Sequence, residues 1–165
     1  MKMANKIIKP AKDFIDLIKC FNKQNVEYCI CGAYSVMYYS RPRYTNDLDV
    51  LIKPTEENIE KTLSALTQFH GAPVTNTDTK ELIYKKQYFE FGVPPVMVHV
   101  MTQIDGVEEK EIWNNLEKGK FGNIETYYIG INELKKNKDV CSKKPTRSNQ
   151  DKVDLQMLEN SVKSK

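Results

Sequence analysis

The chain has 165 residues, 40% of them hydrophobic and 28% charged, with a formal net charge of +3. This length and apolar content predict one domain, residues 1–165, with a sizeable core, and the small net charge does not by itself indicate a nucleic-acid-binding protein. No apolar run approaches the roughly 18 residues of a membrane helix, and residues 1–9 lack the apolar region of a signal peptide. The sequence therefore predicts a cytoplasmic protein that does not enter a membrane.

The first predicted elements are a helix, a buried strand and a second helix. The helix follows from the spacing i, i+3, i+4, i+7 of its apolar residues, Phe14, Leu17, Ile18 and Phe21. It should pack on a sheet that begins with the strand at residues 26–31. Gly32 and Ala33 then form a tight exit from that strand, and residues 34–39 form a short apolar helix.

An acidic strand comes next. The polar, proline-containing loop 40–46 leads to Asp47-Leu48-Asp49, which opens the apolar run 50–52. Side chains at i and i+2 of a strand point to the same face, so the two carboxylates should lie side by side. Paired hard oxygen ligands suit a divalent cation that carries a nucleoside triphosphate. Such pairs also occur as plain solvated residues, so the surrounding sequence decides.

The middle of the chain predicts a helix and three strands. Thr55 is a plausible N-cap for a helix with an apolar stripe, and Gly71 and Pro73 end it; the stripe consists of Ile59, Leu63, Leu66 and Phe69. Residues 74–80 read as a loop, and residues 82–84 and 88–91 as strands. A turn at residues 92–95 leads into the strand 96–101, where His99 should face the same side of the sheet as the aspartates.

The last third is predicted to be mainly helical. Helices are expected around residues 108–116 and 131–136, with a turn at 119–122 and a strand at 126–129 between them. Residues 148–151 fit a capping box that opens a final helix, with Val153, Met157 and Leu158 as its contacts. The division is thus a core at about 12–130 and a helical part at about 131–160.

Two further patterns in the sequence have a plain and a functional interpretation. Positively charged residues are concentrated within 18 residues near the end of the chain, namely Lys135, Lys136, Lys138, Lys143, Lys144, Arg147 and Lys152. They form either a solvated surface or a contact for polyphosphate or RNA. Cys29 and Cys31 alternate within a strand without zinc-finger spacing, which favours thiols that fill the core.

The order of strand, small-residue turn, short helix, basic loop and acidic strand resembles the core of the DNA polymerase beta-like nucleotidyltransferase superfamily. The run Cys31-Gly32-Ala33-Tyr34-Ser35-Val36 followed by Arg43-x-Thr45-x-Asp47-Leu48-Asp49 is similar to its small stand-alone bacterial members. The resemblance continues through residues 92–95, 102–107 and 147–158. It implies an α/β (α+β) nucleotidyltransferase fold, with a mixed β-sheet flanked by helices and a helical C-terminus.

The resemblance also implies a site. Asp47 and Asp49 would be catalytic and hold Mg²⁺ or Mn²⁺, and the nucleotide would be bound by Gly32, Ala33, Ser35, Arg43 and Thr45. Ser35 would offer its hydroxyl group to the phosphates, or would simply cap the helix. Arg43 would bind phosphate, or would neutralise the acidic pair. The tyrosines at 34, 38, 39 and 44 would stack on a base, or would belong to the core.

The chain departs from the family at the third carboxylate, where Met97-Val98-His99 replaces an Arg-Ile-Asp triplet. His99 would be a metal ligand that favours Mn²⁺, a general base for the acceptor hydroxyl group, or a core residue of a site that has lost its chemistry. Glu90 would supply the missing carboxylate if residues 88–101 form a hairpin that sets Glu90 across from Met97 or His99.

The function predicted from this resemblance is metal-dependent transfer of a nucleoside monophosphate from an NTP to an acceptor hydroxyl group on a small molecule, a protein or an RNA end. The alternative is a catalytically degenerate module that binds nucleotide or a cognate partner protein, for example in a toxin-antitoxin or phage-defence pair. A third interpretation is an RNA-binding accessory domain that uses the basic tail.

Overall fold

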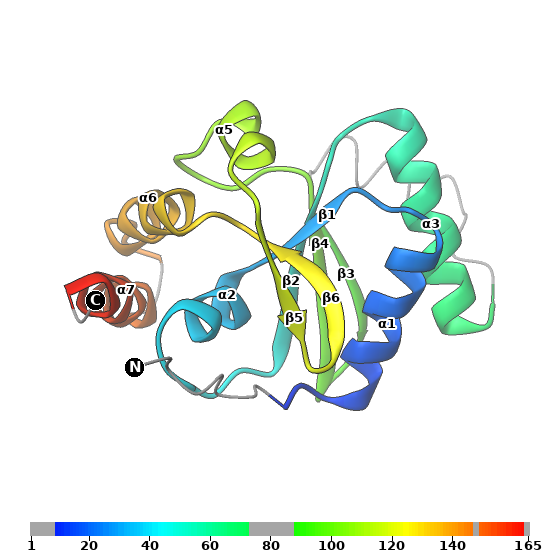
Figure 1. Ribbon diagram of the computed structural model, residues 1–165, viewed down its shortest axis with the longest axis horizontal. Helices are drawn as coiled ribbons and strands as arrows, with labels where there is room; N and C mark the ends of the chain where they lie inside the picture. The colour runs from blue at the N-terminus through cyan, green and yellow to red at the C-terminus, as the bar shows by residue number, and fades with distance from the viewer. Residues whose placement is uncertain (1–8, 73–87, 147–148, 164–165) are drawn as a thin grey trace.

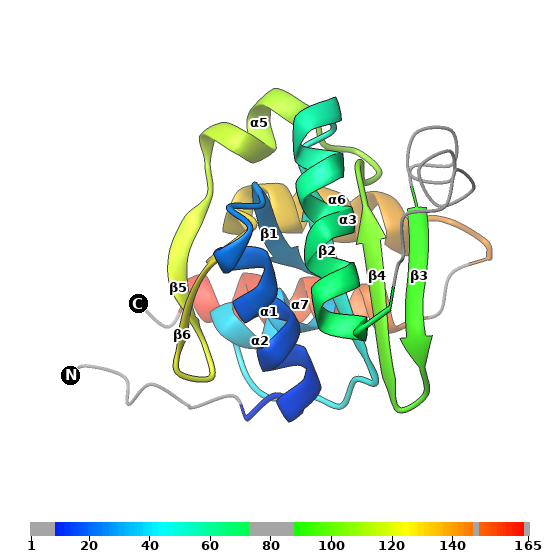
Figure 2. The ribbon, with the colours of Figure 1, turned by 90° about the vertical axis from the view of Figure 1, so that its right-hand side faces the viewer.

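A computed structural model of the chain describes residues 9–72, 88–146 and 149–163. A single mixed sheet of six strands runs through the described residues, in the order β3-β4-β2-β1-β6-β5. Helices α1 and α3 lie on one side of this sheet, and α2, α6 and α7 lie on the other (Figures 1 and 2). Among the described residues, none of the helices is both long and apolar enough to cross a bilayer.

The central strands position the acidic pair. Strand β1 (Tyr28–Cys31) pairs antiparallel with β2 (Asp47–Ile52), which pairs parallel with β4 (Val96–Met101). Strand β3 (Tyr88–Val93) forms an antiparallel hairpin with β4 at one edge of the sheet. At the other edge, β5 (Glu117–Phe121) and β6 (Ile124–Tyr128) form a second hairpin, joined to β1 through a parallel pairing with β6.

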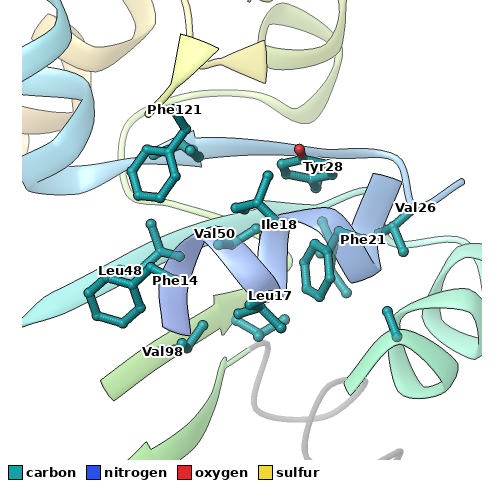
Figure 3. Close-up of a cluster of buried hydrophobic side chains, with 14 of the residues drawn as sticks. Phe14, Leu17, Ile18, Phe21, Val26, Tyr28, Leu48, Val50, Val98 and Phe121 are labelled. Atoms are coloured by element: carbon teal, nitrogen blue, oxygen red, sulfur yellow. The ribbon is translucent and has the colours of Figure 1, made fainter. Parts of the chain in front are cut away.

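Helices α1 (Lys12–Lys23) and α3 (Glu56–His70) cover the first face of the sheet. The predicted apolar stripe of α1 is confirmed, and its four members are buried against Leu48, Val50 and Val98 (Figure 3). Burying each such side chain contributes about 1.5–3 kcal/mol. The predicted ends of α3 are also confirmed, because Thr55 accepts a hydrogen bond from the Asn58 amide and Gly71 adopts the left-handed conformation.

The second face carries α2 (Gly32–Tyr39), α6 (Ile131–Ser142) and α7 (Gln150–Lys163), while α5 (Glu109–Asn114) precedes β5. A second apolar cluster fills this side, and it includes Cys29, Cys31, Val36, Leu51, Leu134 and Leu158. Both cysteines of β1 are free thiols that fill core space, as predicted.

Several predicted elements were wrong in detail. Gly119 lies within β5 and not in a turn; a β-carbon at this position would come within 2.8 Å of Tyr38, so glycine in this strand leaves room for that side chain. Helix α6 continues past residue 136 to Ser142, and α5 ends at Asn114. On α7, Met157 and Leu158 are buried as expected, whereas Val153 is 42% exposed. The loop at 74–80, the strand at 82–84 and Ser148 of the capping box lie outside the described residues.

Candidate active site

Strand β2 presents the two aspartates on one face. Asp47 and Asp49 are partly exposed, while Leu48 and Val50, which alternate with them, are fully buried against α1 and α3. The prediction that both carboxylates share a face of a strand is therefore confirmed. Alternation along an extended backbone is the whole cause, since burying every second side chain fixes where the others point.

Gly32 brings the start of α2 against Asp49. A β-carbon at position 32 would lie 1.9 Å from Oδ2 of Asp49, far inside contact distance, and the φ angle of Gly32 is +61°. Both facts demand glycine, because other residues rarely adopt this backbone conformation. The antiparallel register that pairs Cys31 with Asp49 sets this close approach.

His99 and Glu90 reach the same place from the next two strands. The parallel register places His99 beside Asp49, and His99 Nδ1 lies 2.9 Å from Asp49 Oδ1. The hairpin register places Glu90 opposite His99, with Glu90 Oε1 3.6 Å from His99 Nε2. The prediction that His99 faces the aspartates is confirmed, and of the two residues expected opposite Glu90, Met97 and His99, the hairpin selects His99.

Tyr88 is a neighbour that the sequence pattern did not bring forward. Its hydroxyl group donates a hydrogen bond of 2.8 Å to Glu90 Oε1, and its ring centroid lies 5.4 Å from that of His99. Burial, followed by the carboxylate of Glu90, raises the pKa of Tyr88. The signal was present in the spacing, since Tyr88 and Glu90 are two residues apart on one strand and share a face.

The electrostatics of His99 follow from its partners. The hydrogen bond to Asp49 raises the pKa of His99 above its ordinary value, burial opposes this, and the charges of Asp49, Asp47 and Glu90 add to the rise. The folded protein therefore stabilises the imidazolium form more than water does for a free histidine. A protonated imidazole can neither ligate a metal nor accept a proton until it gives its own proton up.

The donor set fits a divalent cation bound by two carboxylates. Asp47 and Asp49 offer hard oxygen ligands on one face, which suits Mg²⁺ or Mn²⁺. His99 contacts both Asp49 and Glu90. Within residues 9–72, 88–146 and 149–163, no three histidine, cysteine, aspartate or glutamate side chains form a ready metal-binding group.

Three of the residues expected to bind the nucleotide, Ala33, Ser35 and Thr45, differ in burial and in hydrogen bonding. Ala33 is buried in the first turn of α2. Ser35 is fully buried and its hydroxyl group donates to the Ile30 carbonyl at 2.7 Å, so this geometry gives no support to a phosphate contact. Thr45 Oγ1 accepts from the Asp47 amide at 3.3 Å, which fixes the end of the loop that enters β2.

Arg43 occupies neither of the places expected for it. Its Nε and Nη2 each lie 2.9 Å from an oxygen of Asp154 on α7, and its Nη1 donates to the Tyr44 carbonyl at 2.9 Å. The guanidinium group thus neutralises a buried carboxylate of α7 and not the acidic pair of β2. Asp154 stood in the tail that resembles the family, but nothing in the sequence paired it with Arg43.

Most of the tyrosines considered for base stacking belong to the core. Tyr34 packs edge-on against Phe14 and Phe121, and Tyr38 stacks on Tyr128 with ring centroids 4.0 Å apart. Tyr39 is tied by its hydroxyl group to the Ile129 carbonyl. Tyr44, next to Arg43 in the loop that leads to Asp47, is 80% exposed.

No protein-family profile and no curated protein sequence matches the chain. Solved structures do resemble it. A solution structure of the antibiotic-resistance factor ANT(2'')-Ia aligns over 91% of this chain and 82% of its own, with 8% identity and a TM-score of 0.63. The crystal structure of ANT(2'')-Ia in complex with adenylyl-2''-tobramycin aligns over 90% and 87%, with 10% identity and a TM-score of 0.61. The chain has the nucleotidyltransferase fold.

A third structure agrees with this assignment of the fold. An antigenic nucleotidyltransferase-like protein from Paracoccidioides brasiliensis aligns over 92% of this chain and 75% of its own, with 10% identity and a TM-score of 0.56. Identities this low concern the fold alone. The predicted fold class, a mixed sheet flanked by helices with a helical C-terminus, is thereby confirmed.

Proposed function

We propose that the protein is a metal-dependent nucleotidyltransferase that transfers a nucleoside monophosphate from an NTP to an acceptor hydroxyl group. The observation that supports this most is the packing of Gly32 against Asp49, with Asp47 on the same face of β2, in a chain of the nucleotidyltransferase fold. A glycine that brings the start of a helix against an acidic strand leaves backbone amides close to that strand, where phosphates can bind.

Each residue of the site has a proposed task. Asp47 and Asp49 would hold Mg²⁺ or Mn²⁺, which would supply positive charge to neutralise the phosphates of the NTP. Gly32 and Ala33 expose backbone near the triphosphate, and Thr45 fixes the loop before Asp47. His99 accepts the proton of the acceptor hydroxyl group at Nε2, since Asp49 holds its Nδ1.

Metal preference separates this task of His99 from a role as ligand. As a ligand, His99 would make Mn²⁺ support more turnover than Mg²⁺, and His99→Asp would restore or increase activity with Mg²⁺. As a general base, its replacement by aspartate would lower activity with both metals, and the wild-type rate would rise with pH through the raised pKa of His99.

The acceptor class is proposed from one neighbour. ANT(2'')-Ia has been solved with adenylyl-2''-tobramycin, a small molecule that carries an adenylyl group. With ATP as the nucleotide donor, acceptor screening therefore begins with hydroxylated small molecules, aminoglycosides first. Proteins and RNA ends follow. The basic tail gives RNA little support, because Lys138 is buried between aspartates and Lys136, Lys143 and Lys144 each pair with a carboxylate.

A non-catalytic module is the second candidate, and the contact between His99 and Asp49 favours it. That contact occupies Asp49 Oδ1, one of the oxygens that a metal would need, in a chain without the usual third carboxylate. Such a module would bind nucleotide or a cognate partner protein, as in a toxin-antitoxin pair.

Release of labelled pyrophosphate from each NTP, with Mg²⁺ or Mn²⁺ and the acceptor panel, tests the proposal. We expect turnover by the wild type, none by Asp47→Asn combined with Asp49→Asn, and unchanged turnover by Asp13→Asn, which removes an exposed carboxylate of α1. Equal turnover by the wild type and the double variant would overturn the proposal. Nucleotide binding without turnover in the wild type would favour the non-catalytic module.

A further inference from the structure

Charged side chains from three segments meet inside the protein, next to the loop that leads to β2. Arg43 comes from this loop, Lys138 from α6, and Asp151 and Asp154 from α7; Asp154 is 0% exposed, and Lys138 and Asp151 are each 5% exposed. Lys138 Nζ lies 2.9 Å from Asp151 Oδ1 and 2.8 Å from Asp154 Oδ2. The two positive and two negative charges balance.

Asp154 is the member of this cluster that both cations share. Both of its oxygens face the guanidinium group of Arg43, while Oδ2 also accepts from Lys138 and Oδ1 from Gln150. Asp151 is also buried, at 5% exposure, and shares Lys138 with Asp154. The carboxylate of Asp154 is therefore the point where α6 and α7 are tied to Arg43.

Arg43 carries this connection into the loop. Its Nη1 donates to the Tyr44 carbonyl, so the guanidinium group clamps the backbone one residue farther along the chain. Thr45 then receives the Asp47 amide on its hydroxyl oxygen. A continuous set of contacts thus runs from Asp154 through residues 43–45 to the first aspartate of the site.

We propose that Asp154 is a positioning residue for the site, which acts through Arg43 to hold the 43–46 loop and thereby Asp47. This rests on the proposed function only in taking Asp47 as a metal ligand. Buried ion pairs seldom add net stability over apolar residues of similar size, so holding a loop is a reason for this cluster that stability does not supply. Bringing two oxygens of one carboxylate against an arginine also fixes direction, which a single lysine contact does not.

The test compares Asp154→Asn with Asp151→Asn in the full chain. Each variant removes one buried carboxylate from Lys138, but Asp154→Asn also removes the charge that faces Arg43. The measurements are Mn²⁺ affinity, from the electron paramagnetic resonance of free Mn²⁺, and hydrogen exchange of the amides at 43–47. We expect Asp154→Asn to weaken Mn²⁺ binding about tenfold and to speed exchange at 43–47, because residues coupled through contact show effects of this size. Asp151→Asn should leave both unchanged.

A double-mutant cycle and a conservative variant sharpen the test. Arg43→Gln combined with Asp154→Asn should weaken Mn²⁺ binding no more than either change alone, since both break the same link. Arg43→Lys keeps the charge but loses the two-nitrogen contact, and it should reproduce the faster exchange even if Asp154→Asn does not fold. Equal Mn²⁺ affinity for the two aspartate variants, or additive effects in the cycle, would overturn the positioning role.

Failure of the proposed function would look different. If wild-type protein does not bind Mn²⁺, the metal site at Asp47 and Asp49 is refuted, and hydrogen exchange alone decides the role of Asp154. Amides at 43–47 that exchange equally in the wild type and in both Asp154→Asn and Arg43→Lys would then refute positioning as well.

Discussion

The protein holds two clusters of charged side chains that differ in balance and exposure. On β2, β4 and β3, three carboxylates and His99 share a partly exposed face, with 20% of the His99 side chain and 55% of the Glu90 side chain accessible. Between α6, α7 and the 43–46 loop, Lys138 and two carboxylates are almost fully enclosed, and Arg43, with 19% of its side chain accessible, pairs with Asp154 from the loop. The first cluster carries excess negative charge that a ligand can complete, whereas the second is already complete.

Because of this difference, substitutions in the two clusters should lower the free energy of unfolding by different amounts. In the enclosed cluster, burial alone would lower the pKa of Lys138, but Asp154 and Asp151 together raise it above its ordinary value. Its ammonium group therefore stays charged, and its removal leaves negative charge behind in a dry interior. In the exposed cluster, water replaces a lost partner. We expect the larger losses of stability from changes in the enclosed cluster, whereas changes in the exposed cluster should act chiefly on binding.

The largest effect is expected from Lys138→Met. The change removes the cation that lies between Asp151 and Asp154. Breaking a buried ion pair in this way lowers the free energy of unfolding by about 3–5 kcal/mol. Urea unfolding measures the loss. Lys152→Met on α7 is the matched control, because this exposed lysine should change the free energy of unfolding by less than about 0.5 kcal/mol. Similar values for the two variants would mean that the enclosed cluster has no special share in stability.

A somewhat smaller effect is expected from Gly32→Ala. The positive φ angle costs about 1–2 kcal/mol for any residue with a β-carbon, and here that atom would also displace Asp49. Gly71→Ala is the control, since its φ angle is +75° but nothing in the described part of the chain lies within 4 Å of the added atom.

Comparing the two glycine variants isolates the contact with Asp49. We expect Gly32→Ala to unfold at a lower urea concentration than Gly71→Ala and to lose Mn²⁺ and nucleotide binding. If both variants lose the same stability and bind equally well, the close approach of α2 to β2 does not shape the site.

The protonation of His99 should have a smaller effect on the free energy of unfolding, and the direction of its pH dependence follows from the pKa shift. Its folded pKa is raised above the unfolded value of about 6.5, chiefly by the hydrogen bond to Asp49. The stabilisation from this pair is therefore fully present below the unfolded pKa and is lost as the pH rises through the folded pKa. Asp49→Asn removes the main cause and should lower the pKa of His99.

Nuclear magnetic resonance can follow this titration directly. The chain has two histidines, so His70→Gln leaves a single imidazole signal to assign. The difference in unfolding free energy between the wild type and His99→Gln should shrink as the pH rises. A His99 pKa that is unchanged by Asp49→Asn would contradict the electrostatic account of the exposed cluster.

The two clusters also differ in what the sequence could predict. Alternation of apolar residues placed Asp47 and Asp49 on one face of a strand, and the same rule placed His99 beside them. The enclosed cluster leaves no such periodic signal, because Arg43 and Asp154 are 111 residues apart and ion pairing has no fixed spacing.

Lys138 shows why the enclosed cluster was hidden. It takes a core position on α6 in line with Leu134 and Cys141, yet a lysine in a sequence suggests a solvated face. The predicted helix ended at residue 136, whereas the buried face of α6 continues to Cys141. The metal, the NTP and the acceptor lie beyond what spacing or fold can name, since these depend on contacts that only a ligand makes.

The smallest effect on stability is expected from Tyr44→Ala, and it sharpens the comparison because Tyr44 lies between the two clusters. Its backbone carbonyl is clamped by Arg43 of the enclosed cluster, while its ring is 80% exposed three residues before Asp47. Removing the ring should change the free energy of unfolding by less than about 0.5 kcal/mol, whereas Tyr38→Ala, which removes a stacked core ring, should cost about 3–5 kcal/mol.

If the ring of Tyr44 stacks on a base or an aromatic acceptor, the loss appears in ligand binding as about 1–3 kcal/mol with no change in unfolding. Calorimetric titration of nucleotide into Tyr44→Ala and Tyr44→Phe distinguishes these outcomes, since phenylalanine keeps the stacking face. Equal affinity in all three proteins would show that the Tyr44 ring takes no part in binding the nucleotide.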